Sequence, residues 1–211
     1  MTLIYLVRHG ETEWNQEKIF RGRKDIPLSQ KGRKEAEALA KALSQERIQF
    51  IYSSPLKRAI ETAKPLADRL NLSVQICEGF IDLDFGDWEG KSVKEVEKNY
   101  PELFKIWEKA PEKIVFPNGE SLKLARERAM KALQKVAEEN PEKIGAVISH
   151  RVICKLAVLS AIGANESNFW RLQQDLACYN LLEWTGRNWI VRLVNETGHL
   201  KDVAGHLKSD F

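Results

Sequence analysis

Short apolar runs alternate with longer amphipathic segments along the chain. The apolar runs are partly β-branched and break at glycine, proline or polar residues, which is typical of buried strands. The pattern therefore predicts strands over residues 3–8, 49–53, 74–77, 143–149, 181–185 and 189–195. The last two strands flank Gly186-Arg187-Asn188, a sequence that favours a hairpin turn.

Apolar residues at helical spacing predict helices between these strands. After Ser29, for example, Ala36, Leu39, Ala40 and Leu43 fall at i, i+3, i+4 and i+7, so they form one apolar face. Helices are expected from Ser29 to about residue 45, then over 55–70, from 92 onward, in part of 101–115, and over 121–139, 152–162 and 166–172.

Hydroxyl residues mark where several of these helices should begin. Ser54-Pro55 combines a capping side chain with a proline that needs no N–H partner. Ser92 and Glu95 have the spacing of a capping box. Ser121 precedes the long amphipathic segment, so we expect it to cap that helix.

The alternation of strands with helices of ten or more residues predicts an α/β fold. We expect a single-domain three-layer sandwich over residues 1–211, with a mainly parallel sheet flanked by helices on both faces. No internal repeat, low-complexity tract or long linker divides the sequence. A polar tail is expected from about residue 196.

Composition narrows the class of protein. Of the 211 residues 43% are hydrophobic, including 6 Trp, 8 Phe and 4 Tyr, which is enough for a packed core. The 3 cysteines are widely spaced, so a disulfide framework or structural metal is not expected. The net charge of +3 is spread along the chain, which argues against nucleic-acid binding. No apolar run reaches membrane-spanning length and no signal peptide is apparent, so a cytoplasmic protein is expected.

Histidines and arginines gather where three predicted crossovers meet one edge of the sheet. Arg8-His9 ends the first strand, Arg58 lies in the first turn of the helix after the second, and His150-Arg151 ends the strand over 143–149. Ligands of parallel sheets bind at the carboxyl ends of the strands, near helix N-termini. Two imidazoles and several guanidinium groups there predict a pocket for a phosphate dianion.

These residues belong to an ordered set of sequence blocks. The blocks are Leu6-Val7-Arg8-His9-Gly10-Glu11-Thr12, Trp14-Asn15, Gly22 with Asp25-x-Pro27-Leu28-Ser29, Ser53-Ser54-Pro55-Leu56-x-Arg58-Ala59-x-x-Thr62-Ala63, Phe85-Gly86-x-Trp88-Glu89-Gly90, Gly119-Glu120-Ser121 and Ser149-His150. Because it carries these blocks in this order, the chain resembles the phosphoglycerate-mutase-like branch of the histidine phosphatase superfamily.

The resemblance implies a metal-independent phosphomonoester hydrolase with no cofactor. His9 would attack phosphorus and hold a phosphohistidine intermediate. Arg8, Arg58, His150 and Asn15 would bind the phosphate oxygens. The expected partner is a small phosphorylated metabolite. No binding to nucleic acid or to a membrane is expected, and a homodimer is possible.

Two positions depart from the family pattern. Asp82 stands where the branch usually has a glutamate proton donor, and Asp84 is a rival for that role. Arg151 replaces the usual glycine after the second histidine, which suggests a further phosphate-binding charge or a solvent-facing side chain. Gly22 and Phe85 are expected to line the substrate site.

Two other functions remain open at this point. A 2,3-bisphosphoglycerate-dependent phosphoglycerate mutase would need a second cationic cluster, which the segment around Asp82 lacks. A non-catalytic phosphate-binding homologue or partner subunit is suggested by the two departures, although both histidines and both arginines are intact.

Overall fold

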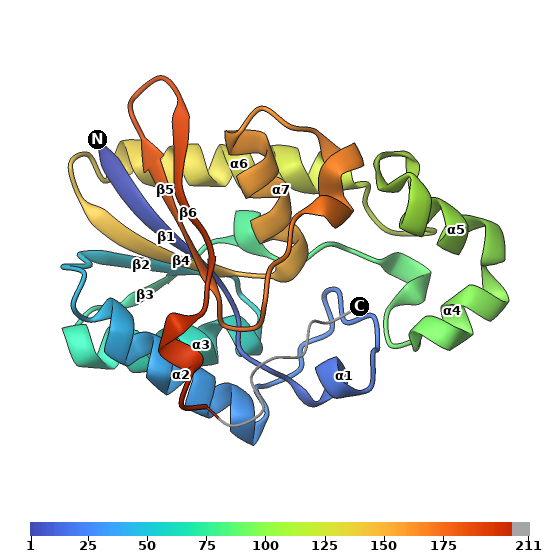
Figure 1. Ribbon diagram of the computed structural model, residues 1–211, viewed down its shortest axis with the longest axis horizontal. Coiled ribbons are helices and arrows are strands. Elements are labelled where there is room, and N and C mark those ends of the chain that lie inside the picture. Colours follow the sequence, from blue (N-terminus) through green and yellow to red (C-terminus); the bar gives the residue numbers. More distant parts are fainter. Residues whose placement is uncertain (204–211) are drawn as a thin grey trace.

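Six strands form one sheet in the computed structural model, which describes residues 1–203 (Figure 1). The strands are Thr2–Arg8 (β1), Phe50–Ser53 (β2), Val74–Ile76 (β3), Ile144–Ser149 (β4), Tyr179–Trp184 (β5) and Trp189–Glu196 (β6). Their order across the sheet is β3-β2-β4-β1-β5-β6. The first four in this order pair in parallel, whereas β5 and β6 are antiparallel, so the expected mainly parallel sheet is confirmed.

Helices connect the strands. The α-helices are Glu13–Gln16 (α1), Gln30–Leu43 (α2), Lys57–Leu70 (α3), Val93–Asn99 (α4), Pro101–Lys109 (α5), Leu122–Glu139 (α6) and Arg151–Ala161 (α7). Short 3-10 turns cover Glu78–Phe80, Gly86–Trp88, Pro111–Lys113, Glu166–Arg171 and Gly198–Leu200.

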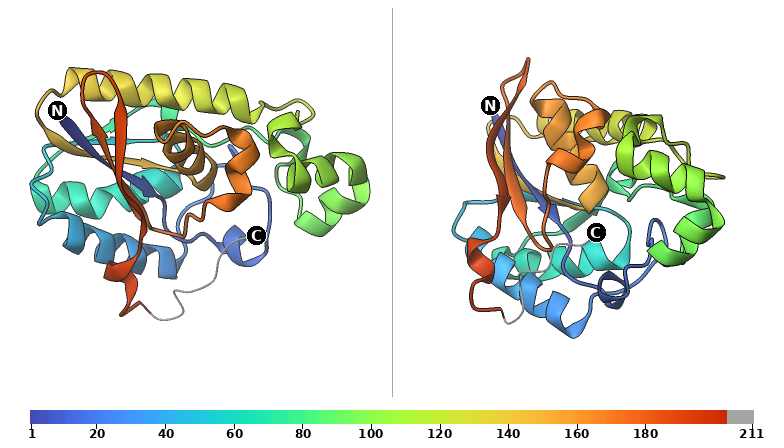
Figure 2. Two further views of the ribbon diagram at one scale, coloured as in Figure 1. Left: turned by 45° about the horizontal axis from the view of Figure 1, so that its top comes forward. Right: turned by 45° about the vertical axis from the view of Figure 1, so that its right-hand side comes forward.

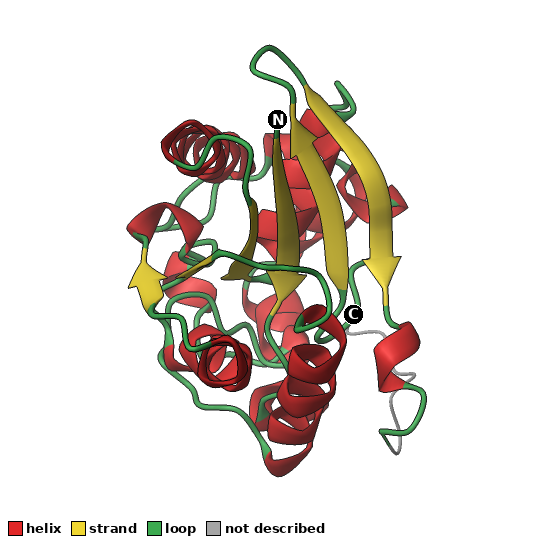
Figure 3. Ribbon diagram, turned by 90° about the vertical axis from the view of Figure 1, so that its left-hand side faces the viewer, coloured by secondary structure: helices red, strands yellow, loops and turns green. Residues whose placement is uncertain are grey.

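Alternate side chains of β1 enter two different cores, because neighbouring residues of a strand point to opposite faces. Tyr5 and Val7 pack with α2 and α3, whereas Ile4 and Leu6 pack with α6 and α7. Figures 1 and 3 show these helix pairs on opposite sides of the sheet. The expected three-layer α/β sandwich is therefore confirmed.

A third core, rich in aromatic side chains, lies beyond the edge of the sheet. It joins α4 and α5 to the segment around Phe85 and Trp88, and ring centroids of Trp88 and Phe116 are 5.0 Å apart. Figure 2 shows α4 and α5 standing away from the sheet. This core holds the segment that carries Asp82 against the body of the protein.

Several local predictions were wrong. The loop expected before Pro27 contains α1, and α3 begins at Lys57 with Leu56 as its cap, so Ser54-Pro55 precedes the helix. The short helix expected over 166–172 is present as a 3-10 helix, Glu166–Arg171.

β6 runs through Glu196, close to where the polar tail is expected to begin. A 3-10 helix, Gly198–Leu200, follows and buries Leu200. Residues 204–211 of that tail lie outside the described part. Within residues 1–203, no helix is long and apolar enough to cross a membrane.

We expect Gly32→Ala to destabilise the fold, because an added Cβ would lie 2.1 Å from the backbone oxygen of Glu11. This contact joins the first turn of α2 to the loop after β1, and backbone cannot move aside cheaply. A loss of about 1–3 kcal/mol in the free energy of unfolding is expected from urea denaturation. Lys34→Ala, on the exposed face of the same helix, is the control. Equal stability of the two variants would contradict the close approach.

Candidate functional site

The pairing of β1 with β4 brings the two site histidines together. The strands are parallel and adjacent, and Arg8 lies opposite Ser149 in their register. His9 and His150 each follow by one residue, so they emerge side by side at the carboxyl edge. Their ring centroids are 5.2 Å apart, and each residue is at most 1% exposed.

The tautomer of His9 follows from one hydrogen bond. Its Nδ1 lies 2.7 Å from the carbonyl oxygen of Gly10. Because a carbonyl oxygen only accepts, Nδ1 carries the proton and Nε2 keeps a lone pair in the neutral ring. Burial lowers the pKa of His9 well below its ordinary value, and the charges of Arg58, Arg8 and Arg21 lower it further. The ring is therefore neutral at pH 7, with Nε2 able to act as a nucleophile.

The second histidine has the opposite tautomer. Nδ1 of His150 accepts a hydrogen bond from Nε of Arg58 at 3.2 Å. Its Nε2 therefore carries the proton and donates to Oγ of Ser54 at 2.7 Å. Burial and the charge of Arg58 lower the pKa of His150 well below its ordinary value. Ser54, which the sequence suggested as a helix cap, thus orients this ring.

The guanidinium of Arg58 joins segments far apart in the sequence. Besides His150 it reaches the carbonyl oxygens of Gly22 at 2.6 Å and Lys24 at 2.8 Å, and the carboxylate of Asp82 at 3.1 Å. The residue is fully buried. The carbonyl of Gly22 can take this position because its backbone has φ of +50°, and a Cβ there would clash with Glu89. Arg58 therefore fixes the loop before α2 against the segment after β3.

Asp82 points into the site, and Asp84 does not. Oδ2 of Asp82 lies 3.6 Å from Nδ1 of His150, in addition to its ion pair with Arg58. Asp84 instead pairs with Arg23 at 3.2 Å and has a side chain 28% exposed. The geometry places Asp82, rather than its rival, beside the histidines.

An arginine on α6 holds the backbone that carries Asp82. Arg128 donates to the carbonyl oxygens of Gly79, Ile81 and Asp82, and its guanidinium pairs with Glu120 at 2.6 Å. The motif Gly119-Glu120-Ser121 gave a hint of this contact, but no pattern in the sequence indicated Arg128.

Two expected phosphate-binding residues have clear structural partners. Arg8 is 1% exposed and donates from Nη1 to the carbonyl oxygen of Gln174 at 2.7 Å. Asn15 lies on α1, where its Oδ1 accepts from the backbone N–H and the hydroxyl of Thr12 at 2.8 Å. A contact between Asn15 and a phosphate would therefore be made by its Nδ2.

A small pocket opens over His9. Among the described residues its walls are His9, Ile19, Phe20, Arg21, Gly22, Asp82, Phe85, Arg151 and Val152. His9, Asp82, Gly22, Phe85 and Arg151 were expected there, and the structure brings them together. Arg58 and His150 are buried beside it.

Arg21 is a charged pocket residue that the sequence reasoning missed. It is 9% exposed, and its charge lowers the pKa of both histidines. Its position directly before Gly22, the first residue of a recognised block, was the signal that could have revealed it.

The pocket combines a neutral imidazole with a surplus of fixed positive charge. Arg21 and Arg151 line the pocket and Arg8 and Arg58 lie beside it, whereas Asp82 is the only carboxylate among the described residues of its wall. Such a site can attract an oxyanion, stabilise charge on its oxygens and present a nitrogen lone pair to its central atom. No group of three metal-ligating side chains occurs within residues 1–203.

Comparisons with known proteins identify the family of this chain. The family model described as the histidine phosphatase superfamily, branch 1, matches residues 4–197. Phosphoserine phosphatase 1 of Hydrogenobacter thermophilus is 37% identical over 200 residues, which cover 95% of each chain. Among solved structures, Bacillus stearothermophilus YhfR has a TM-score of 0.92 at 28% identity, covering 95% of this chain and 100% of that one. A phosphoserine phosphatase from Entamoeba histolytica, in complex with 3-phosphoglyceric acid, has a TM-score of 0.84 at 27% identity with the same coverage. The chain belongs to the histidine phosphatase superfamily.

Proposed function

We propose that this chain hydrolyses phosphomonoesters of small metabolites through a phosphohistidine at His9, without a metal ion. One observation carries the proposal: the hydrogen bond from Nδ1 of His9 to Gly10 leaves Nε2 unprotonated inside a cationic pocket. The relatives named phosphoserine phosphatases support a phosphatase with a small substrate. The lack of a metal requirement rests on the arginines, which supply the positive charge that a metal would otherwise provide.

The reaction runs in two steps. Nε2 of His9 attacks phosphorus and the bond from phosphorus to the ester oxygen breaks. Asp82, which takes up a proton from solvent when phosphate replaces it on Arg58, gives that proton to the leaving oxygen. Water then attacks the phosphohistidine, Asp82 accepts a proton from that water, and phosphate leaves with Nε2 restored. In both steps Arg8, Arg58 and His150 balance the charge that develops on the phosphate oxygens.

The remaining site residues have supporting roles in this scheme. Nδ2 of Asn15 and the side chain of Arg151 would bind phosphate oxygens at the pocket rim. Gly22 and Phe85 would line the space for the alcohol part of the substrate. Because Arg58 holds Asp82 and His150 in the free protein, phosphate binding would exchange one of these bonds for a phosphate oxygen.

The two alternatives are weaker. A mutase has to return the phosphoryl group to a second substrate oxygen and exclude water, whereas two of the relatives described above are named phosphoserine phosphatases. A non-catalytic homologue would have no need for a histidine with a free Nε2 lone pair beside a carboxylate. The cytoplasmic location and the homodimer stay predictions from the sequence.

We expect His9→Ala to lose phosphate release from para-nitrophenyl phosphate by at least about 10⁴-fold, because the nucleophile is gone. The wild type should keep its activity after treatment with EDTA. His199→Ala, which changes a histidine outside the pocket walls, is the matched control. Activity in His9→Ala would refute the nucleophile assignment, and loss on chelation, restored by a divalent ion, would refute metal independence.

Asp82→Asn tests the proton donor. We expect a loss of about 10² or more in kcat for alkyl phosphates, the usual contribution of general acid catalysis. Formation of phosphohistidine from an aryl phosphate should suffer less, because a phenolate leaves with little protonation, so the acid-labile adduct should accumulate and be visible by mass spectrometry. Asp84→Asn is the control because Asp84 faces Arg23. A crippled Asp84→Asn beside a near-normal Asp82→Asn would reverse the assignment.

The pH dependence of stability tests the neutral state of His9. Its folded pKa lies well below 6.5, so below pH 6.5 the unfolded chain binds a proton that the folded chain does not. The free energy of unfolding therefore falls as the pH drops through this range. His9→Asn removes this contribution, so urea denaturation in phosphate-free buffer should give a shallower fall, by up to about 1.4 kcal/mol per pH unit. Identical slopes for variant and wild type would contradict the lowered pKa.

A further inference from the structure

A buried carboxylate contacts the peptide that fixes the tautomer of His9. Glu35 lies on α2 and is 0% exposed, and its Oε2 accepts a hydrogen bond from the backbone N–H of Glu11 at 2.8 Å. This N–H belongs to the same peptide unit as the carbonyl of Gly10, which accepts from Nδ1 of His9 at 2.7 Å. A carboxylate, a peptide and an imidazole are therefore joined in series by two hydrogen bonds.

The peptide between Gly10 and Glu11 is a rigid connector. Because its C–N bond has partial double-bond character, the C=O and the N–H lie in one plane and point in opposite directions. A side chain that fixes the direction of the N–H therefore also fixes the direction of the carbonyl. Glu35 thus aims the Gly10 oxygen at the imidazole from the far side of the peptide.

The same series of hydrogen bonds changes the electron density of the ring. A negative charge at the N–H polarises the peptide, so its carbonyl becomes a stronger acceptor. A stronger acceptor at Nδ1 raises the electron density at Nε2, the atom that attacks phosphorus in the proposed reaction. When the bond to phosphorus forms, the ring becomes cationic, and the polarised carbonyl stabilises that charge.

Other contacts hold the backbone on either side of this peptide. The N–H of Gly10 donates to Oγ1 of Thr62 at 3.1 Å, and the carbonyl oxygen of Glu11 accepts from the N–H of Ser29 at 2.8 Å. The path of the loop therefore does not depend on Glu35 alone. The contact that Glu35 adds is directed at the N–H whose peptide carbonyl touches the nucleophile.

The hydrogen bond by itself does not account for an acid at this position. Burial raises the pKa of Glu35, so an ionised side chain costs free energy here, and the carboxylate of Glu11 adds to this effect. The N–H of Glu11 and the charges of Lys31 and Arg8 act in the opposite direction, and Nζ of Lys31 lies 3.6 Å from Oε1 of Glu35. A glutamine would accept the same hydrogen bond without burying a charge. The charge therefore points to a role beyond satisfying one N–H.

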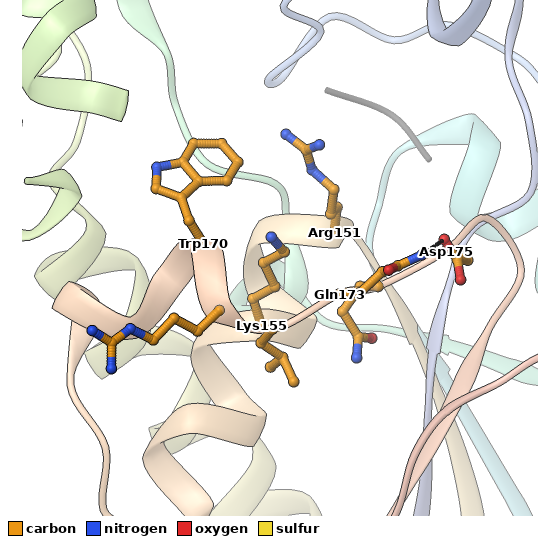
Figure 4. A pocket seen from close by; sticks show the side chains of 8 residues that line it. Arg151, Lys155, Trp170, Gln173 and Asp175 are labelled. Carbon is orange, nitrogen blue, oxygen red and sulfur yellow. Dashed lines mark hydrogen bonds between the residues drawn. The ribbon is translucent and has the colours of Figure 1, made fainter. Parts of the chain in front are cut away.

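Positive charge surrounds His9 on the sides away from this peptide. Arg151 lines the pocket over His9 and also an adjoining pocket of about 280 Å³ beside α7. Figure 4 shows the ammonium of Lys155 in this second pocket, between the Trp170 indole and the Arg151 side chain. Lys155 is 5% exposed, and its Nζ donates to the carbonyl oxygen of Phe169 at 3.2 Å and lies 4.9 Å from the ring centroid of Trp170.

These cations repel one another. Burial and the charges of Arg151 and Arg8 lower the pKa of Lys155 to about 7. An imidazole of His9 that becomes cationic during attack adds to this repulsion. A negative charge that acts on the ring from the opposite side offsets it, and Glu35 is placed to supply that charge through the peptide.

We propose that Glu35 is a positioning residue for the nucleophile, acting through the Gly10–Glu11 peptide. Its carboxylate keeps the proton of His9 on Nδ1 and raises the rate at which Nε2 attacks phosphorus, without touching the substrate. No bond to Glu35 forms or breaks in either step. This inference rests on the proposed phosphatase function and assigns a residue that tunes its nucleophile.

Glu35→Gln is the decisive variant, because a glutamine oxygen can accept from the same N–H without a negative charge. With enzyme in excess over para-nitrophenyl phosphate, the release of nitrophenolate in a single turnover measures the formation of phosphohistidine. We expect this rate to fall by about tenfold in Glu35→Gln and by up to about 100-fold in Glu35→Met, which removes the acceptor oxygen as well. The affinity for inorganic phosphate, measured by calorimetry, should not weaken. Glu37→Gln, on the exposed face of the same helix, is the control.

NMR supplies a readout that a purely structural role would not move. The ring nitrogen signals of His9, identified by their absence in His9→Gln, should show Nδ1 protonated and Nε2 bare in the wild type. The resonance of the Nδ1 proton should move upfield in Glu35→Gln as its hydrogen bond weakens, and further upfield in Glu35→Met.

Three results would overturn the proposal. The first is a wild-type single-turnover rate in Glu35→Gln, whatever the effect of Glu35→Met. The second is a lower rate with an unmoved Nδ1 proton, and the third is a lower rate matched by an equal loss of phosphate affinity. Either of the last two would make Glu35 structural.

The NMR experiment also separates this inference from the proposed function. If the wild type releases no phosphate from any ester, the proposed function fails, and the proton shifts of the two Glu35 variants still decide whether Glu35 acts on the ring. A Nδ1 proton that moves in both variants supports the contact through the peptide. An unmoved Nδ1 proton rejects it.

Discussion

A fully buried guanidinium connects the segments from which the site is built. Arg58 starts from the first turn of α3, and its hydrogen bonds reach the loop before α2, the segment after β3 and the histidine after β4. Burying this charge lowers the pKa of Arg58, and the carboxylate of Asp82 opposes that effect. Removing either partner of such a pair leaves the other charge buried and uncompensated. Arg58 therefore fixes the geometry of the loops, in addition to its expected contact with phosphate.

The same cations that prepare the pocket for phosphate also keep the histidines neutral. The charges of Arg58, Arg8 and Arg21 add to the effect of burial on the pKa of His9. A protonated ring would have no lone pair to attack phosphorus, so the charges that would attract the substrate also keep His9 in the state that the proposed nucleophile requires. The carbonyl of Gly10 completes this arrangement by holding the proton on Nδ1.

The sequence was most informative where local pattern and topology coincide. Apolar runs located β1 and β4, and the parallel pairing of strands then implied that His9 and His150 meet at one edge, as the register confirms. Ser29, Ser92 and Ser121 cap their helices as expected, because capping depends on neighbours in the chain. Ser54 was misassigned because its partner is a histidine 96 residues away.

No local sequence pattern predicted the long-range contacts of single charged side chains. Arg128 on α6 lies in an ordinary amphipathic pattern, where a basic residue is normally solvated. Lys155 on α7 is the one charged residue in the apolar run over 152–162, and the sequence gives it no partner. Their roles depend on which loops fold over them: the backbone around Asp82 in one case, and Phe169 and Trp170 in the other. Arg151 is an intermediate case. Its place after His150 marked it in the sequence, but only the fold shows that its side chain lines two adjoining pockets. The residues expected to bind phosphate are thus indicated by local motifs, whereas the contacts of Arg128, Lys155 and Arg151 are set by tertiary packing.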